Sequence, residues 1–256
     1  MPPLKSVAKL PSDSVFEAVK KVTPTTIAFP ALAAGLSYAA YASDLAVSIW
    51  PWRISLIVML ACFLGTASIY AKARRTNALW ACGAISAIGM FAAYYFFGVF
   101  AYFYYFLFSP MPILVRWSGF LGGAVLTIYW MAVARRGIKH TIEHTSFPKN
   151  AFIDDGDVIS YDLQKGMRSF ERLYKERLPF PKIYSYIVYG IAPFYLILNR
   201  LLTTNFGSTG VLLFMAVLGM PMSLWFASVF VRVCLVMVAL PIRIEREQRK
   251  RVVATM

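Results

Sequence analysis

Two histidines and a glutamate form the group of residues in this sequence best suited to hold a metal ion. His140 and His144 are four residues apart with Glu143 between them, so a helix would place both imidazoles on one face. A catalytic zinc ion needs three protein ligands and an open position, and the third ligand would have to be an acid such as Asp154 or Asp155. We interpret the pair as part of a solvated helix, and we expect no metal site and no cofactor.

Other candidate catalytic patterns are incomplete. Asp154, Asp155 and Asp157 could suggest a cation loop, but the glutamate that closes an EF-hand loop is missing. We interpret these acids as a turn that leads into a helix. Ser208 lies between two glycines, but we expect it on the opposite side of a membrane from both histidines, so no serine and histidine pair can form. The sequence therefore indicates no catalytic residues and favours a protein that is not an enzyme.

The composition indicates a membrane protein. The 256 residues are 59% hydrophobic and 15% charged, whereas soluble domains are about half apolar and about one quarter charged. Cys62, Cys82 and Cys234 lie in apolar stretches without a Cys-x-x-Cys spacing. This pattern predicts small buried side chains that neither form disulfides nor bind a metal.

The elements that must position any site are apolar stretches long enough to cross a bilayer. A helix needs roughly 20 apolar residues to cross a hydrocarbon core of about 30 Å. Six stretches meet this need, namely 26–43, 54–71, 78–100, 113–134, 183–202 and 210–240. We predict an all-α integral membrane protein, a bundle of six transmembrane helices with both termini cytoplasmic and one amphipathic helix in the cytoplasmic loop between spans 4 and 5.

The positions of the basic residues set the orientation. If the N-terminus is inside, all 26 Lys and Arg residues except Arg53, Arg116 and Arg200 lie on the inner side or near it. The positive-inside rule requires this distribution, and short outer loops favour a bacterial inner membrane. The net charge of +14 then matches a bilayer with an anionic inner leaflet, so a nucleic-acid partner is not needed.

This topology divides the chain into five segments. They are a cytoplasmic N-terminal tail with a short amphipathic helix that Pro24 ends (1–25), a four-span region (26–134), a basic cytoplasmic loop with an amphipathic helix (135–182), a two-span region (183–241) and a basic cytoplasmic C-terminal tail (242–256).

The inner loop is predicted to be helical from Asp157 onward. One face carries an apolar stripe at helical spacing, consisting of Leu163, Met167, Phe170, Tyr174 and Leu178. Basic residues lie off the stripe, namely Lys165, Arg168, Arg172 and Lys175. Such a helix either lies on an anionic membrane surface or docks against a cytoplasmic partner.

Features within the spans suggest where helices bend, pack and carry charge. Stretches 78–108 and 210–240 are too long to cross upright, so each must tilt, break or project, and Pro221 is the expected kink in the second. Arg232 either snorkels to the inner headgroups, which we favour, or points into the bundle. Small residues predict close helix packing, and we assign this role to Gly35, Gly119 and Gly123.

Residues 94–108 form an unusually aromatic stretch, in which 11 of 15 side chains are Tyr or Phe. Tyr and Trp collect at membrane interfaces because the ring is apolar while the hydroxyl or N–H contacts water. We interpret the stretch as an interfacial belt, with a surface that packs on a partner helix or binds a flat ligand as the alternative.

These features favour a non-enzymatic subunit or accessory factor of a larger membrane assembly, of the secretion, conjugation, surface-exclusion or export type. Its partner would be a membrane or cytoplasmic protein. The alternative is a small-molecule or ion transporter or channel subunit with its pathway near Pro221 and Arg232. A third class, an enzyme that acts on lipid, would need His140, Glu143 and the acids of 154–157 to converge.

Overall fold

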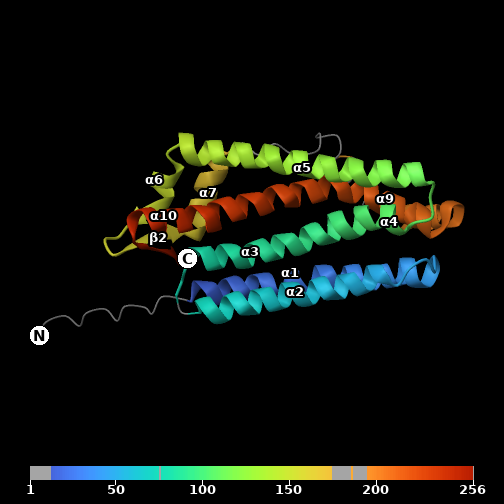
Figure 1. Cartoon of the computed structure of the whole chain (residues 1–256), viewed down its shortest axis with the longest axis horizontal. Coiled ribbons are helices and arrows are strands. Elements are labelled where there is room, and N and C mark those ends of the chain that lie inside the picture. The colour runs from blue at the N-terminus through green and yellow to red at the C-terminus, as the bar shows by residue number, and fades with distance from the viewer. Residues whose placement is uncertain (1–12, 75, 175–185, 187–194, 256) are drawn as a thin grey trace, which may run out of the picture.

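The computed structural model describes residues 13–74, 76–174, 186 and 195–255, and it consists mainly of long helices that lie side by side (Figure 1). The first helical stretch is α1 (Ser14–Ser37), which continues as the π-helix η1 (Tyr38–Asp44), and α2 (Trp50–Ala73) follows it. The next stretch consists of α3 (Leu79–Tyr94), the π-helix η2 (Tyr95–Phe103) and α4 (Tyr104–Phe108), and it leads to α5 (Ile113–His144). The last stretch consists of α9 (Tyr195–Val233), the π-helix η4 (Cys234–Ala239) and α10 (Leu240–Gln248).

Within the described residues, four helical stretches are long and apolar enough to cross a membrane. They are Trp50–Ala73, Leu79–Phe108, Ile113–His144 and Thr209–Gln248. The first and third have only 17% of their apolar window buried, against 50% and 56% for the other two. Stretches Leu79–Phe108 and Thr209–Gln248 therefore form the centre of the bundle, while α2 and α5 present apolar faces outward, as helices in contact with lipid do. The predicted class of helical membrane protein fits this architecture.

Helix α1 is longer than the first predicted span. It begins at Ser14, where the carboxylate of Asp13 accepts a hydrogen bond from the Phe16 amide at 3.1 Å, and it continues through Pro24. The prediction that Pro24 ends a separate short helix is wrong. Packing holds the helix together at this point, because Val22 fits against Gly89 of α3 so closely that a Cβ on that glycine would lie 2.6 Å from Val22.

The last long helix breaks at a glycine rather than at a proline. Gly207 has φ 62° and ψ −163°, a conformation that only glycine adopts readily, and it interrupts α9. Pro221, the predicted kink, lies inside α9 without such a departure. The break falls in the predicted loop between the fifth and sixth spans. Most of the predicted fifth span, 183–202, lies outside the described residues, so the count of six spans stays a prediction.

A small sheet forms at one end of the bundle (Figure 1). Its strands are β1 (Phe152–Asp154), β2 (Val158–Asp162) and β3 (Arg251–Thr255), in the order β1-β2-β3. β1 runs antiparallel to β2, whereas β3 runs parallel to β2 with Ile159 opposite Val252. We call residues 145–174 and 249–255 the cap. It also contains helices α6 (Phe147–Ala151) and α7 (Leu163–Leu173).

The cap corrects two sequence predictions. The predicted helix start at Asp157 is instead a bend followed by the strand Val158–Asp162, and the C-terminal segment 242–256 contains a paired strand rather than only a tail. Ile159 and Tyr161 of β2 are buried on the same side as Val252 and Ala254 of β3, because side chains two residues apart in a strand share one face.

Hydrogen bonds join four parts of the chain at this end. Ser14, at the start of α1, donates from its amide to the Asn77 side chain at 2.8 Å and from its hydroxyl to the carbonyl of Ala254 at 2.9 Å. The amide of Ala254 in turn donates to the carbonyl of Asn77 at 2.7 Å. Because β3, which contains Ala254, also pairs with β2 of the inner loop, the start of α1, the turn between α2 and α3, the inner loop and the C-terminal strand meet at a single place.

Buried side chains form two clusters. The inner core joins the cap to the adjacent half of the bundle and includes Ile85, Ile138, Phe147, Phe170 and Val236. The outer core fills the other half and is mostly aromatic, with Tyr41, Tyr95, Phe100, Tyr104 and Tyr105.

Candidate functional site

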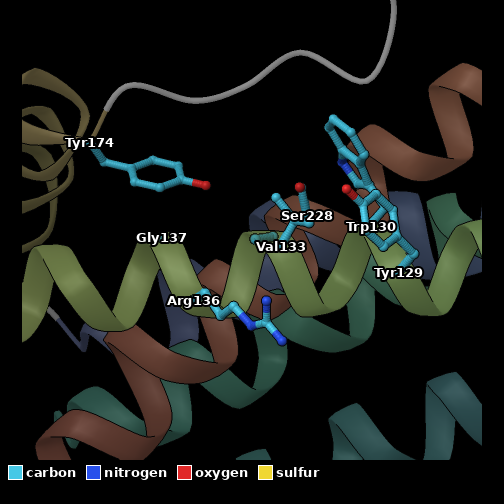
Figure 2. A pocket seen from close by; sticks show the side chains of 8 residues that line it. Tyr129, Trp130, Val133, Arg136, Gly137, Tyr174 and Ser228 are labelled. Atoms are coloured by element: carbon cyan, nitrogen blue, oxygen red, sulfur yellow. The ribbon is translucent and has the colours of Figure 1, made fainter.

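The junction between bundle and cap contains a pocket of about 380 Å³. Its described lining comes mainly from α5, with Ser228 of α9 and Tyr174 at the end of α7 completing it; the α5 residues are Tyr129, Trp130, Val133, Ala134, Arg136 and Gly137. Figure 2 shows the Tyr174 ring lying over α5 on the same side as Trp130, whereas the Arg136 side chain extends from the other side of the helix. A Cβ on Gly137 would lie 3.1 Å from the Tyr174 ring, so the glycine leaves room for this ring.

The pocket has an amphipathic lining. Val133 and Ala134 are apolar, while the hydroxyls of Ser228 and Tyr174 can donate or accept hydrogen bonds. The indole nitrogen of Trp130 is buried and donates to no atom of the described structure. The lining therefore combines apolar and hydrogen-bonding groups with one cation, Arg136.

Arg232 lies one helical turn beyond Ser228 on α9. Its side chain is buried, with 8% of its surface exposed, and its Nη1 lies 3.7 Å from Oε1 of Glu171 on α7. The residue therefore joins the bundle to the cap. This placement differs from the snorkelling that the sequence favoured, because α7 supplies a carboxylate where a lipid headgroup was expected.

A second and larger pocket, of about 610 Å³, lies in the cap between the end of α5, the sheet and α10. Its apolar lining includes Phe152, Ile159 and Ile244, and charged residues of both signs line it as well, namely Glu143, Lys149, Asp154, Arg243 and Glu247. Several of these charges are paired: Arg243 donates to Glu247 at 2.7 Å, and Lys250 donates to Asp154 at 2.6 Å. Lys250 holds the pKa of Asp154 below its ordinary value.

The acids that could suggest a cation loop form a hairpin turn. Asp154 accepts a hydrogen bond from the Gly156 amide at 3.0 Å, and Gly156 has φ 90°. The helix α7 begins later than predicted, at Leu163, where Asp162 accepts hydrogen bonds from the amides of Gln164 and Lys165.

The two histidines stack on each other on the exposed side of α5. Their ring centroids are 4.6 Å apart and the rings are inclined by 13°. In the part of the chain that the structure describes, no group of three or more His, Cys, Asp or Glu side chains comes close enough to hold a metal. Glu143 and Asp154 line the larger pocket together, but His140 and His144 are not part of its described lining.

The apolar stripe of the inner loop faces the protein itself. Phe170 is fully buried; its ring meets Phe147 of α6 edge to face with 5.0 Å between centroids, and the Tyr174 ring centroid lies 5.3 Å away. Leu163 and Met167 pack against the same inner core. The basic residues Lys165, Arg168 and Arg172 are exposed, whereas Lys175 and Leu178 lie outside the described residues. The described part of the stripe, from Leu163 to Tyr174, therefore packs on the protein itself.

Two of the three packing glycines meet aromatic rings. A Cβ would lie 2.0 Å from the Phe106 ring at Gly119 and 2.2 Å from the Tyr102 ring at Gly123, and the Tyr102 hydroxyl donates to the Gly119 carbonyl at 2.9 Å. Gly35 has no such neighbour, since nothing in the described structure lies within 4 Å of a Cβ built there.

The aromatic stretch 94–108 packs largely inside its own bundle. Tyr95, Phe100, Tyr104 and Tyr105 are buried in the outer core, so the interpretation as an interfacial belt does not hold for these four side chains. The Tyr95 hydroxyl shares hydrogen bonds with Ser55 at 2.8 Å and with Tyr104 at 2.7 Å.

Glu171, Trp130 and Ser228 are site residues that sequence reasoning missed. Ser228 and Arg232 share a face of one helix because they are four residues apart, and this spacing is the only signal that could have linked them. The pairing of Glu171 with Arg232 depends on tertiary structure and leaves no local pattern.

Comparison with known proteins finds no family, no curated protein and no solved structure that matches this chain. The fold and the site therefore define only the general class of protein to which this chain belongs. It is a mainly helical protein with four described helices able to cross a membrane and a small mixed cap at one end of the bundle.

Proposed function

We propose that this chain is a six-span membrane protein with both termini cytoplasmic, and that it is a non-enzymatic subunit or accessory factor of a larger assembly in a bacterial inner membrane. The observation that carries the proposal is the cap. Four chain segments join there, at the end of the bundle where α2 ends with Lys72 and Arg74 and where the last turns of α5 carry Lys139. α2 and α5 begin at the other end of the bundle (Figure 1), and their first turns contain Arg53 and Arg116. This polarity supports an inner cap by the positive-inside rule.

The cap offers a surface that lipid does not cover. Ile153, in the edge strand β1, has 57% of its surface exposed, although this part of the chain lies outside the four apolar helices. In the described structure β1 pairs with β2 alone, so its other edge is free to accept an extended segment of a partner by strand addition. The partner we propose is a cytoplasmic protein or the cytoplasmic segment of another membrane subunit.

The test is co-purification from native membranes in mild detergent, with mass spectrometry of what the protein retains. Ile153→Glu should lose a protein that wild type retains, because the substitution places a charge on the exposed edge. Gln164→Glu adds the same charge at another exposed position of the cap and should keep that protein. Substitution of Phe170 would be a poor probe, because that ring is fully buried and its loss would disturb the cap itself. If wild type retains no protein, or if both variants retain it equally, docking through β1 is rejected.

Transport is the second candidate, and the pocket beside Ser228 supports it. Arg136 supplies a cation to the pocket lining, and the buried Arg232 follows Ser228 by one turn on the same helix. Conductance or solute flux should then appear in proteoliposomes and disappear in Arg232→Gln, while Arg246→Gln, an exposed arginine of α10, should conduct like wild type. The absence of any flux in wild type would reject this candidate.

A further inference from the structure

The outer face of the cap helix α7 borders a basic pocket that the proposed function does not use. The pocket has a volume of about 330 Å³ and lies between α6 and α7, lined by Asn150, Lys165, Arg168, Ser169, Arg172 and Leu173. Three of these six residues are cationic and none is acidic. A lining of this kind attracts anions, and arginine in particular binds phosphate oxygens with two parallel hydrogen bonds.

The acids near the pocket leave most of this charge uncompensated. Asp162 lies 3.6 Å from Lys165, but Lys165 is largely exposed, so the pair is weak. Glu171 lies between Arg168 and Arg172 in sequence, yet its carboxylate pairs with Arg232 of α9. Arg168 and Arg172 form no ion pair with any residue that the structure describes.

The two arginines are held in a defined relation to each other. They are four residues apart on α7, so they lie one above the other on the same side of the helix. The helix is fixed in turn by Phe170, whose ring is fully buried against Phe147 of α6. Ser169 and Asn150 add a hydroxyl and an amide that can donate to further oxygens of the same anion.

We infer that this pocket binds a phosphate group, with Arg168 and Arg172 as its principal ligands. The phosphate could belong to an anionic phospholipid of the inner leaflet or to a soluble phosphate compound, since the recognition chemistry is the same. The inference is independent of the assembly proposed above, because it concerns α6 and α7 rather than the edge strand β1.

The experiment uses the full-length purified protein and two probes. One arm titrates inorganic phosphate into the protein in neutral detergent by calorimetry, and the other measures retention of phosphatidylglycerol against phosphatidylcholine by native mass spectrometry. The double variant Arg168→Gln, Arg172→Gln should weaken binding of the responding probe at least tenfold. The control Arg246→Gln, Arg249→Gln removes two exposed arginines elsewhere, gives the same change in net charge and should bind like wild type.

The two arms separate the possible sources of the phosphate. Binding of inorganic phosphate indicates a soluble compound, whereas selective retention of phosphatidylglycerol without phosphate binding indicates the lipid. Binding in neither arm, or an equal loss in the two double variants, would overturn the proposed site. Circular dichroism of both double variants should match wild type, because all four arginines are exposed and their removal leaves the core intact.

Discussion

The inner and outer cores of this protein are stabilised in different ways. The inner core is built from segments that are far apart in sequence, as the hydrogen bond between Ser14 and Ala254 illustrates. The outer core takes most of its large side chains from one aromatic stretch and joins Tyr95 to Ser55 and Tyr104 through hydroxyls. The difference indicates that the cap end depends on long-range chain connections, whereas the opposite end depends on local aromatic packing and on satisfying polar groups away from water.

The largest expected effect is on the inner core. Phe170→Ala should cost about 3–5 kcal/mol of stability, because it removes a fully buried ring that packs against Phe147 and Tyr174. Hydrogen exchange in detergent should show faster exchange in β2 and β3 and little change in η2. Leu173→Ala, at an exposed position of the same helix, is the control and should leave exchange close to wild type. Equal acceleration in η2 would show that the two cores unfold as one unit.

Two neighbouring glycines test packing between the aromatic stretch and α5. Gly123→Ala should destabilise by about 1–3 kcal/mol, because its Cβ would lie 2.2 Å from the Tyr102 ring. Gly122→Ala meets nothing within 4 Å and should be neutral or slightly stabilising, since alanine favours a helix over glycine. Thermal unfolding in a single detergent measures both variants. Equal stabilities would mean that Tyr102 moves aside at little cost.

The buried hydroxyls of the outer core should have a smaller effect. Tyr95→Phe should cost about 1–2 kcal/mol, because Tyr104 loses its hydrogen-bond partner while Ser55 keeps its bond to the carbonyl of Pro51. Chemical denaturation measures the loss. The control is Tyr129→Phe, which changes a tyrosine with 60% of its surface exposed and should leave the free energy of unfolding unchanged. A similar loss of stability in both variants would show that the hydrogen bonds among Ser55, Tyr95 and Tyr104 do not stabilise the outer core.

The smallest expected effect is the pH dependence of the cap. Lys250 lowers the pKa of Asp154 in the folded protein, so this pair stabilises the fold above the pKa of an unfolded aspartate, about 3.9. The contribution should be lost as the pH falls through the lower, folded-state pKa. Wild type should therefore melt slightly above Asp154→Asn at pH 6, and the difference should vanish in strong acid. A difference that grows on acidification would contradict the assigned direction of the shift.

Part of this organisation could be predicted from the sequence because it depends on local patterns. Hydropathy located α2 and most of α5, and Leu163, Met167 and Phe170, whose helical spacing predicted an amphipathic helix, fall in α7. The same spacing could not tell whether that face met a partner, a membrane or the protein itself. The structure places Phe170 in the protein's own core.

The missing elements share a physical cause. β2 and β3 are five residues each and pair across almost ninety intervening residues, so neither strand shows its partner in its own sequence. Pro24 was expected to end a helix because the rule considers only the local backbone, whereas packing of α1 against its neighbours decides the outcome here. The pocket beside Ser228 was missed for the same reason, since its lining comes from separate helices.

The proposal of an inner cap can be tested most directly by cysteine accessibility in intact cells. In a background without Cys62, Cys82 and Cys234, a single cysteine replaces Asp155, exposed on the cap hairpin, or Val47, exposed at the opposite end. We predict that a membrane-impermeant thiol reagent labels the Val47→Cys protein from outside, and labels the Asp155→Cys protein only after the membrane is opened. Labelling of Asp155→Cys in intact cells would contradict the inner position of the cap and the function proposed for it.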